Sequence, residues 1–263
     1  MIGTDPEVFL FDADTEKYIS AIGLVGGTKK HPRKVKKGAV QEDNVLAEYN
    51  IDPASNNQEF LENIRTVEEE LQKIVGKLEL HKVSSVHMPE DQLAHPLAKV
   101  FGCESDWNAW DMGVNPAPAS SSAPRLRTAS GHVHLDITDD SPMAKVNVVR
   151  LFDYRVALPL TALDPDKERR TLYGRAGDFR NTKYGVECRV PSNYWLRSDE
   201  LILWMWEEAR FCSTISPSHV EMYLNSYMGN LPPDSMRHIV NTGDNEAAAS
   251  MCNALQLHIP KGA

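Results

Sequence analysis

Three short motifs carry residues whose types and spacing could hold a divalent metal ion. GTDPE places Asp5 and Glu7 two residues apart, so both carboxylates face the same side of an extended backbone. SGHVH likewise places His132 and His134 on one face of a strand. Side-by-side carboxylates share either a proton or a cation, and oxygen ligands without a cysteine pair favour Mg²⁺ or Mn²⁺ over zinc.

The third motif, QEDNVLAEYN, adds a second group of acids. Its candidate metal ligands are Glu42, Asp43 and Glu48, and Glu48 shares one strand face with Asn50. A simpler interpretation exists for each motif. The sequence around Pro6 could be an exposed turn, and a single histidine is more often structural than a ligand.

A stretch rich in arginine supplies the opposite charge. The local charge is positive there, although the net charge of the whole chain is negative. The stretch is RRTLYGRAGDFRNTKYGVECR, and its cations are Arg169, Arg170, Arg175, Arg180, Lys183 and Arg189. In its closing run, the period of a strand sends Glu187 and Arg189 to the same face. Such a pair suits a metal-bound polyphosphate, because the carboxylate takes the cation and the guanidinium takes phosphate oxygens. The alternative is a solvated basic loop followed by an ordinary surface ion pair.

Strands and helices must together position these residues. Alternating apolar residues predict strands at 3–12, 18–23, 39–51, 83–89, 126–138 and 186–190. Helical spacing predicts helices at 57–81, at 142–163 with Pro159 bending or ending it, and at 198–215, followed by shorter helical pieces. In the helix at 198–215 we expect Glu207 and Glu208 to face solvent, with Trp204 and Trp206 in the core or an interface.

Composition is that of a soluble globular protein, with 41% hydrophobic and 25% charged residues in 263. We expect a single domain, because neither repeats nor low-complexity tracts interrupt the chain. The net charge of −9 argues against nucleic acid as a general partner. The sequence shows no apolar run long enough for a membrane span and no signal-peptide pattern, which predicts a cytoplasmic protein. The four scattered cysteines, Cys103, Cys188, Cys212 and Cys252, indicate buried apolar side chains rather than zinc or disulfides.

Two segments could shield a reaction from water. GGTKKHPRKVKKG predicts an exposed loop that could act as a lid over phosphate, although solubility is the simpler explanation for its lysines. A long irregular segment rich in Pro and Ser contains Trp107 and Trp110, whose large rings argue against disorder of its first half.

The motifs stand in an order that resembles a known family. Their combination resembles the phage-encoded carboxylate-amine ligases of type 2. The motifs that carry this resemblance are, in order, GTDPE, QEDNVLAEYN with the following PAxxNxEF, SGHVH, YGRAGDFRxxxYGVECR and SNYW. That family is part of the glutamine-synthetase-like superfamily, with the glutamate-cysteine ligases. The resemblance spans about residues 3 to 196, and the part from about 200 carries no matching motif.

The resemblance implies an α+β fold in which an antiparallel sheet curves into a half-barrel with helices on its convex face. Its concave face would hold ATP with Mg²⁺ or Mn²⁺, and an acyl phosphate formed on a carboxylate substrate would be attacked by an amine. The carboxylate would come from an amino acid or peptide. A homo-oligomer in the cytoplasm of an infected bacterial host would also fit this family.

The resemblance also implies roles for individual residues. The metal ligands would be Asp5, Glu7, Glu48, His132 and Glu187, with Glu42 or Asp43 as a further ligand. The nucleotide-binding residues would be His134, Arg170, Arg175, Arg180, Lys183 and Arg189, and among them Arg175, Arg180 and Arg189 would act in catalysis. Two positions depart from the family: Asp5 stands where many members have Glu, and Cys188 where relatives often have an aromatic residue.

Two other functions fit the same motifs. A phosphotransferase acting on a guanidino or carboxyl group would stop at the phosphate, so its ADP release would not depend on an amine. A non-catalytic phage protein for binding or virion assembly would keep the scaffold without needing its acids to bind metal.

Overall fold

The computed structural model describes residues 1–99, 106–115 and 124–261. A broken N-terminal strand joins its two larger sheets. β1 (Ile2–Thr4) pairs with β12 (Val133–Asp136), and β2 (Glu7–Asp12) pairs with β6 (Leu46–Ile51). The break falls at Asp5-Pro6, where proline has no N–H to donate to a neighbouring strand.

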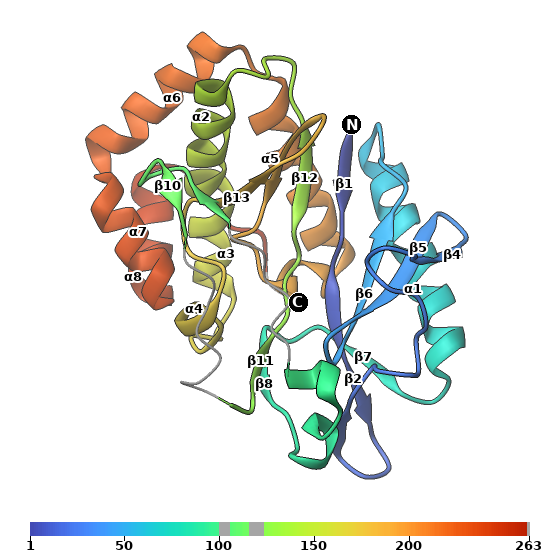
Figure 1. Ribbon diagram of the computed structural model, residues 1–263. Helices are drawn as coiled ribbons and strands as arrows, with labels where there is room; N and C mark the ends of the chain where they lie inside the picture. The colour runs from blue at the N-terminus through green and yellow to red at the C-terminus, as the bar shows by residue number, and fades with distance from the viewer. Residues whose placement is uncertain (100–105, 116–123, 262–263) are drawn as a thin grey trace.

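One sheet has the order β1-β12-β14-β13-β9-β10, and the other has the order β3-β2-β6-β5-β4 with β7 also paired to β2. A separate pair joins β8 to β11. The remaining strand bounds are β3 (Lys17–Ile19), β4 (Arg33–Val35), β5 (Gly38–Asp43), β7 (Glu79–His81), β8 (Ser85–His87), β9 (Trp107–Asn108), β10 (Gly113–Val114), β11 (Leu126–Thr128), β13 (Asp178–Asn181) and β14 (Gly185–Cys188). Every strand pair within the described residues is antiparallel, and the sheets together form a strongly curled half-barrel, as predicted (Figure 1).

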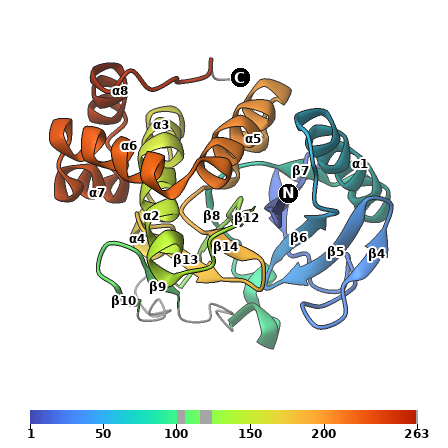
Figure 2. The same ribbon diagram turned by 90° about the horizontal axis from the view of Figure 1, so that it is seen from above.

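Helices cover the sheets. α1 (Asn57–Val75) packs on β5 and β6, and α5 (Asp199–Thr214) packs on β1 and β12 (Figure 2). The other helices are α2 (Pro142–Phe152), α3 (Leu158–Leu163), α4 (Arg169–Leu172), α6 (Pro217–Asn230), α7 (Pro233–Thr242) and α8 (Asn245–Ala254). α6, α7 and α8 form an outer layer against α2 and α3. Within the described residues, no helix has both the length and the apolar character that crossing a membrane requires.

The apolar stripe of α1 forms the core as expected, since Phe60, Ile64, Val67 and Leu71 are fully buried. The Asn56 side chain caps its N-terminus by accepting from the Glu59 N–H. The predicted C-terminal end at residue 81 was wrong. The helix ends at Gly76, which has a φ of 67°, and the next residues form β7 against β2.

Two further expectations need correction. The helix predicted at 142–163 is divided by a π-helical turn, Asp153–Ala157, so the irregularity precedes Pro159 instead of starting there. Glu208 does not face solvent, because its carboxylate accepts a 2.6 Å bond from Arg155 Nε in a buried position. Trp204 and Trp206 are buried as expected.

The cysteine prediction is confirmed where the structure describes it. Cys188, Cys212 and Cys252 are buried free thiols, and Cys103 lies outside the described residues.

Candidate active site

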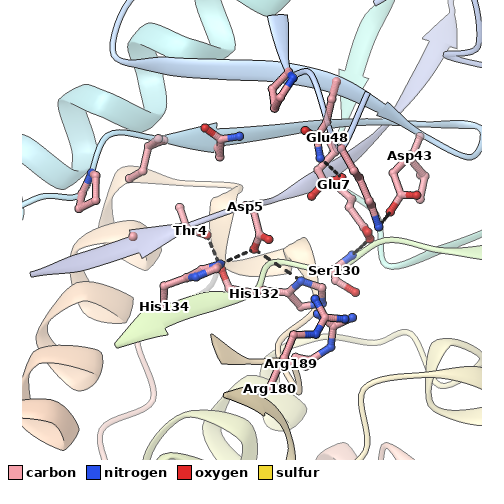
Figure 3. A pocket seen from close by; sticks show the side chains of 18 of the residues that line it. Thr4, Asp5, Glu7, Asp43, Glu48, Ser130, His132, His134, Arg180 and Arg189 are labelled. Atoms are coloured by element: carbon pink, nitrogen blue, oxygen red, sulfur yellow. Dashed lines mark hydrogen bonds and ion pairs between the residues drawn. The ribbon is translucent and has the colours of Figure 1, made fainter. Parts of the chain in front are cut away.

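A cavity of about 530 Å³ lies where the two sheets meet (Figure 3). Its acids and histidines are Asp5, Glu7, Asp43, Glu48, Asp136, His132 and His134, and its cations are Lys29, Arg127, Arg180 and Arg189. These residues come from the two larger sheets, from β11 of the separate strand pair and from the loops between strands. The predicted same-face pairs are confirmed, since Glu48 and Asn50 both line the cavity, as do His132 and His134.

Asp5, His132 and Glu187 form a group in which one ligand atom from each side chain lies within 4.8 Å of the others. His132 Nδ1 is 3.5 Å from both Asp5 Oδ1 and Glu187 Oε1. The group forms because β1, β12 and β14 are neighbours in the sheet. His134 lies two residues after His132, on the same face. Its Nε2 is 3.0 Å from Asp5 Oδ1, and its Nδ1 forms a 2.8 Å hydrogen bond with the Tyr184 hydroxyl.

The donor set of Asp5, His132 and Glu187 fits a divalent metal ion. Asp5 Oδ1 is buried yet has no well-aligned hydrogen bond among the described residues. Burial opposes ionisation of Asp5, but His134 and His132 outweigh it and hold its pKa below the ordinary range. Burial and Arg189 lower the pKa of His132, which favours the neutral imidazole that binds metals.

The Glu7–Asp43–Glu48 group is a second set of acids beside the first. β2 and β6 pair Glu7 directly with Glu48. Glu7 Oε2 accepts from the Ser130 N–H at 2.7 Å, and Glu48 Oε2 accepts from Gln41 Nε2 at 2.7 Å. Burial and Asp43 raise the pKa of Glu7 to about 8, and burial with Asp5 and Asp43 raises that of Glu48 well above its ordinary value. The mutual repulsion that raises these pKa values would be relieved by a cation beside the carboxylates.

Lys29 reaches this group, and the sequence interpretation missed it. Its Nζ lies 2.9 Å from Asp43 Oδ2. Burial opposes the charge, but Asp43 and Glu48 outweigh it and raise the pKa of Lys29 above its ordinary value. The Lys-rich loop was predicted to be exposed, and the Lys29 side chain is 54% exposed, but periodicity gives no signal for which of its lysines points towards the acids.

Arg180 and Arg189, two of the predicted phosphate-binding residues, line the cavity. Arg189 pairs with Glu187 through Nη1 and lies 3.0 Å through Nε from Asp106 Oδ1. Arg180 contacts the same two acids: its Nη1 lies 3.4 Å from Glu187 Oε2, and its Nη2 lies 3.6 Å from Asp106 Oδ1. The Tyr173 ring also contacts this side, with its centroid 5.3 Å from Arg189 Cζ. Asp106 carried no spacing signal in the sequence, because it belongs to an irregular segment.

The structure does not bring the other predicted cations into the cavity. Arg175 and Lys183 are exposed and do not line it. Arg170 is buried and donates to the carbonyls of Gly174 and Val190. The arginine-rich stretch is therefore divided: Arg170 and its neighbour Arg169 brace the backbone, and only two of its arginines face the cavity.

Glu42 is also outside the cavity, contrary to its prediction as a possible metal ligand. The alternation of β5 sends it to the face opposite Gln41 and Asp43. Its Oε1 accepts from the backbone N–H groups of Gly23 and Gly26 at 3.0 and 2.9 Å. Glu42 therefore anchors the preceding loop, and of the two alternatives only Asp43 remains in the candidate ligand set.

Residues 119–221 match the model of the family described as Phage phiEco32-like COOH.NH2 ligase-type 2. This match confirms the predicted resemblance over the part of the motif order that it covers, and it continues past residue 200, where the sequence showed no matching motif. The matched segment includes the two histidines and the run that contains Arg180, Glu187 and Arg189, whereas Asp5, Glu7 and Glu48 precede it. A search among curated proteins found no match.

Proposed function

We propose that the protein is an ATP-dependent carboxylate-amine ligase that forms an amide or peptide bond through an acyl phosphate. One observation carries this proposal. Asp5 and His132, which form a group suited to a divalent ion with the neighbouring Glu187, line one cavity together with two arginines, and several of these residues lie in the segment that matches a carboxylate-amine ligase family.

Asp5, His132 and Glu187 would hold a divalent ion, and the Glu7–Asp43–Glu48 group is the candidate for a second. Mg²⁺ or Mn²⁺ bound there would offset the negative charge of the ATP phosphates. His134 would face the nucleotide, since it lines the same cavity and its Nδ1 is held by Tyr184.

Arg180 and Arg189 would bind phosphate oxygens. Their contacts with Glu187 and Asp106 fix the direction of both guanidinium groups, while both side chains still line the cavity. Fixed donors stabilise charge at the transferring phosphoryl group without having to reorganise during the reaction.

The reaction would proceed in two displacements. A carboxylate oxygen of the substrate attacks the γ-phosphorus of ATP, the bond to the β-phosphate oxygen breaks, and ADP leaves. The amine nitrogen then attacks the acyl carbon, the carbon–oxygen bond to phosphate breaks, and the amine loses a proton. The first step is needed because a free carboxylate is a poor acyl donor at neutral pH.

Release of ADP in the presence of Mg²⁺ tests the proposal. The purified protein would be screened with ATP, amino acids and short peptides as carboxylates, and a panel of amines. We expect ADP release that requires both substrates and that falls at least about a hundredfold in Glu187→Gln. ADP release without an amine would favour the phosphotransferase, and an absence of turnover with every pair would count against the ligase.

A further inference from the structure

Lys29 occupies an unusual place for a lysine of an exposed hairpin. Its ammonium group lies against Asp43, and its side chain lines the cavity together with Glu7 and Glu48. Glu7 and Glu48 are 9% and 7% exposed, so their charges are poorly screened by solvent. A positive charge at this point offsets part of the repulsion among the three acids.

The backbone sets this position. Thr28 and His31 exchange backbone hydrogen bonds of 3.1 and 3.0 Å, which closes a tight turn with Lys29 and Lys30 at its tip. Glu42 holds the start of the same loop through Gly23 and Gly26. Gly27, with a φ of 82°, packs so closely that a Cβ would lie 2.6 Å from Arg33 N and 2.7 Å from Val40 O. The turn is thus fixed over the acids.

We propose that Lys29 is a tethered cation of the Glu7–Asp43–Glu48 group, and that a divalent ion enters this group only when the ammonium leaves it. The inference rests on the proposed function, because it concerns metal binding in the same cavity. Lys29 and a metal ion would compete for Asp43 Oδ2, which lies 2.9 Å from Lys29 Nζ. The Lys29 side chain is 54% exposed, so it has room to withdraw towards solvent.

Without nucleotide, wild-type protein would therefore bind a divalent ion tightly only at Asp5, His132 and Glu187. Lys29→Met keeps most of the length of the side chain and removes its charge. Lys30→Met is the matched control, because Lys30 shares the turn but is exposed and does not line the cavity.

Binding of Mn²⁺ to the full-length protein, measured by electron paramagnetic resonance without nucleotide, tests the proposal. We expect Lys29→Met to bind about one more Mn²⁺ per chain than wild type, or to bind its second ion at least about tenfold more tightly. Lys30→Met should match wild type. The gain should disappear in the double variant Lys29→Met/Glu48→Gln, which assigns the extra ion to this group.

Equal binding curves for wild type and Lys29→Met would overturn the proposal, and so would wild type that already binds both ions tightly. The same holds for a Lys29→Met protein that binds no Mn²⁺ while its circular dichroism spectrum is unchanged. Failure of the proposed function would look different. The ligase proposal fails if no ADP is released, or if no ion binds at Asp5, His132 and Glu187. In either case the Lys29 inference is still tested, because it depends only on the difference in Mn²⁺ binding between Lys29→Met and wild type.

Discussion

Arg180 and Arg175 are two arginines of one stretch that the structure places differently. Arg180 lines the cavity, whereas Arg175 is exposed outside it. We expect Arg180→Gln to lower the rate of ADP release by roughly a hundredfold, as loss of one fixed donor to a transition-state charge does. Arg175→Gln, the matched control, should stay within about twofold of wild type. Equal losses in initial-rate assays of the two variants would contradict this assignment.

Glu187 carries a separate prediction about metal affinity. Its Oε1 lies 3.5 Å from His132 Nδ1 in the group with Asp5. Glu187→Gln retains the shape but removes the negative charge, so we expect Mn²⁺ affinity to fall by about tenfold or more. Isothermal titration without nucleotide measures this directly. Unchanged affinity in this variant, with Asp5→Asn weakening it, would remove Glu187 from the ligand set.

At the scale of elements, polar contacts of Asp164 fix the segment before α4 to Ser84, which precedes β8, and to Ser192, which follows β14. Asp164 Oδ2 accepts from the hydroxyls of Ser84 and Ser192 at 2.5 and 2.6 Å, in a buried position. Asp164→Ala would leave both hydroxyls without this acceptor and should cost about 2–4 kcal/mol of unfolding free energy. Urea denaturation measures the loss. Glu168→Ala, which removes the exposed contact with His87, should change stability little.

Sequence periodicity predicted the strands that carry the site and failed where distant contacts decide the structure. Alternation placed His132 beside His134 correctly, because each strand has one buried face. The helical spacing continued beyond Val75, but Gly76 ends the helix and pairing with β2 converts the following residues into a strand. Periodicity within one segment contains no information about such pairing.

The same limit applies to the candidate site. The sequence identified Asp5, Glu48 and Arg189 through local spacing and a family resemblance, and all three line the cavity. It could not distinguish the cations that face the cavity from the others of the same stretch. Arg170 donates to a backbone carbonyl, and Lys183 is exposed to solvent. That choice depends on how the loop packs against other segments, and irregular loops have no fixed period.

At the scale of the whole molecule, the curled sheet concentrates opposite charges that lie far apart in the sequence. Acids of the N-terminal motifs reach the cavity from β2 and β6, and arginines reach it from β13 and the segment after β14. The cavity therefore depends on contacts between segments far apart in the sequence, and one such contact is the 2.7 Å bond from the N–H of Ser130, in the loop between β11 and β12, to Glu7 in β2. A net charge of −9 is therefore compatible with a local cationic surface, because the fold gathers arginines on one side of the cavity.

The pH dependence of the unfolding free energy tests, without any ligand, whether the buried Asp153 is protonated in the folded protein. Asp153 lies in the π-helical turn between α2 and α3, and its Oδ2 accepts a 2.6 Å bond from Trp110 Nε1. Burial and the nearby Asp178 raise its pKa to about 8, against the opposing effects of the Trp110 bond and Arg170. The folded protein therefore keeps a proton that the unfolded chain releases near pH 4.

Stability should accordingly fall as pH rises from about 4 to 8, by up to about 1.4 kcal/mol per pH unit from this residue alone. Asp178, with a pKa raised to about 6, acts in the same direction only in the lower part of that range. Urea denaturation at pH 6 and 8 therefore isolates Asp153 best, and other groups such as Glu7 cancel when Asp153→Asn is compared with wild type. We expect Asp153→Asn to gain stability relative to wild type between these two pH values, because asparagine has no proton to lose. Parallel stability curves for the two proteins would show that Asp153 is already ionised in the folded state.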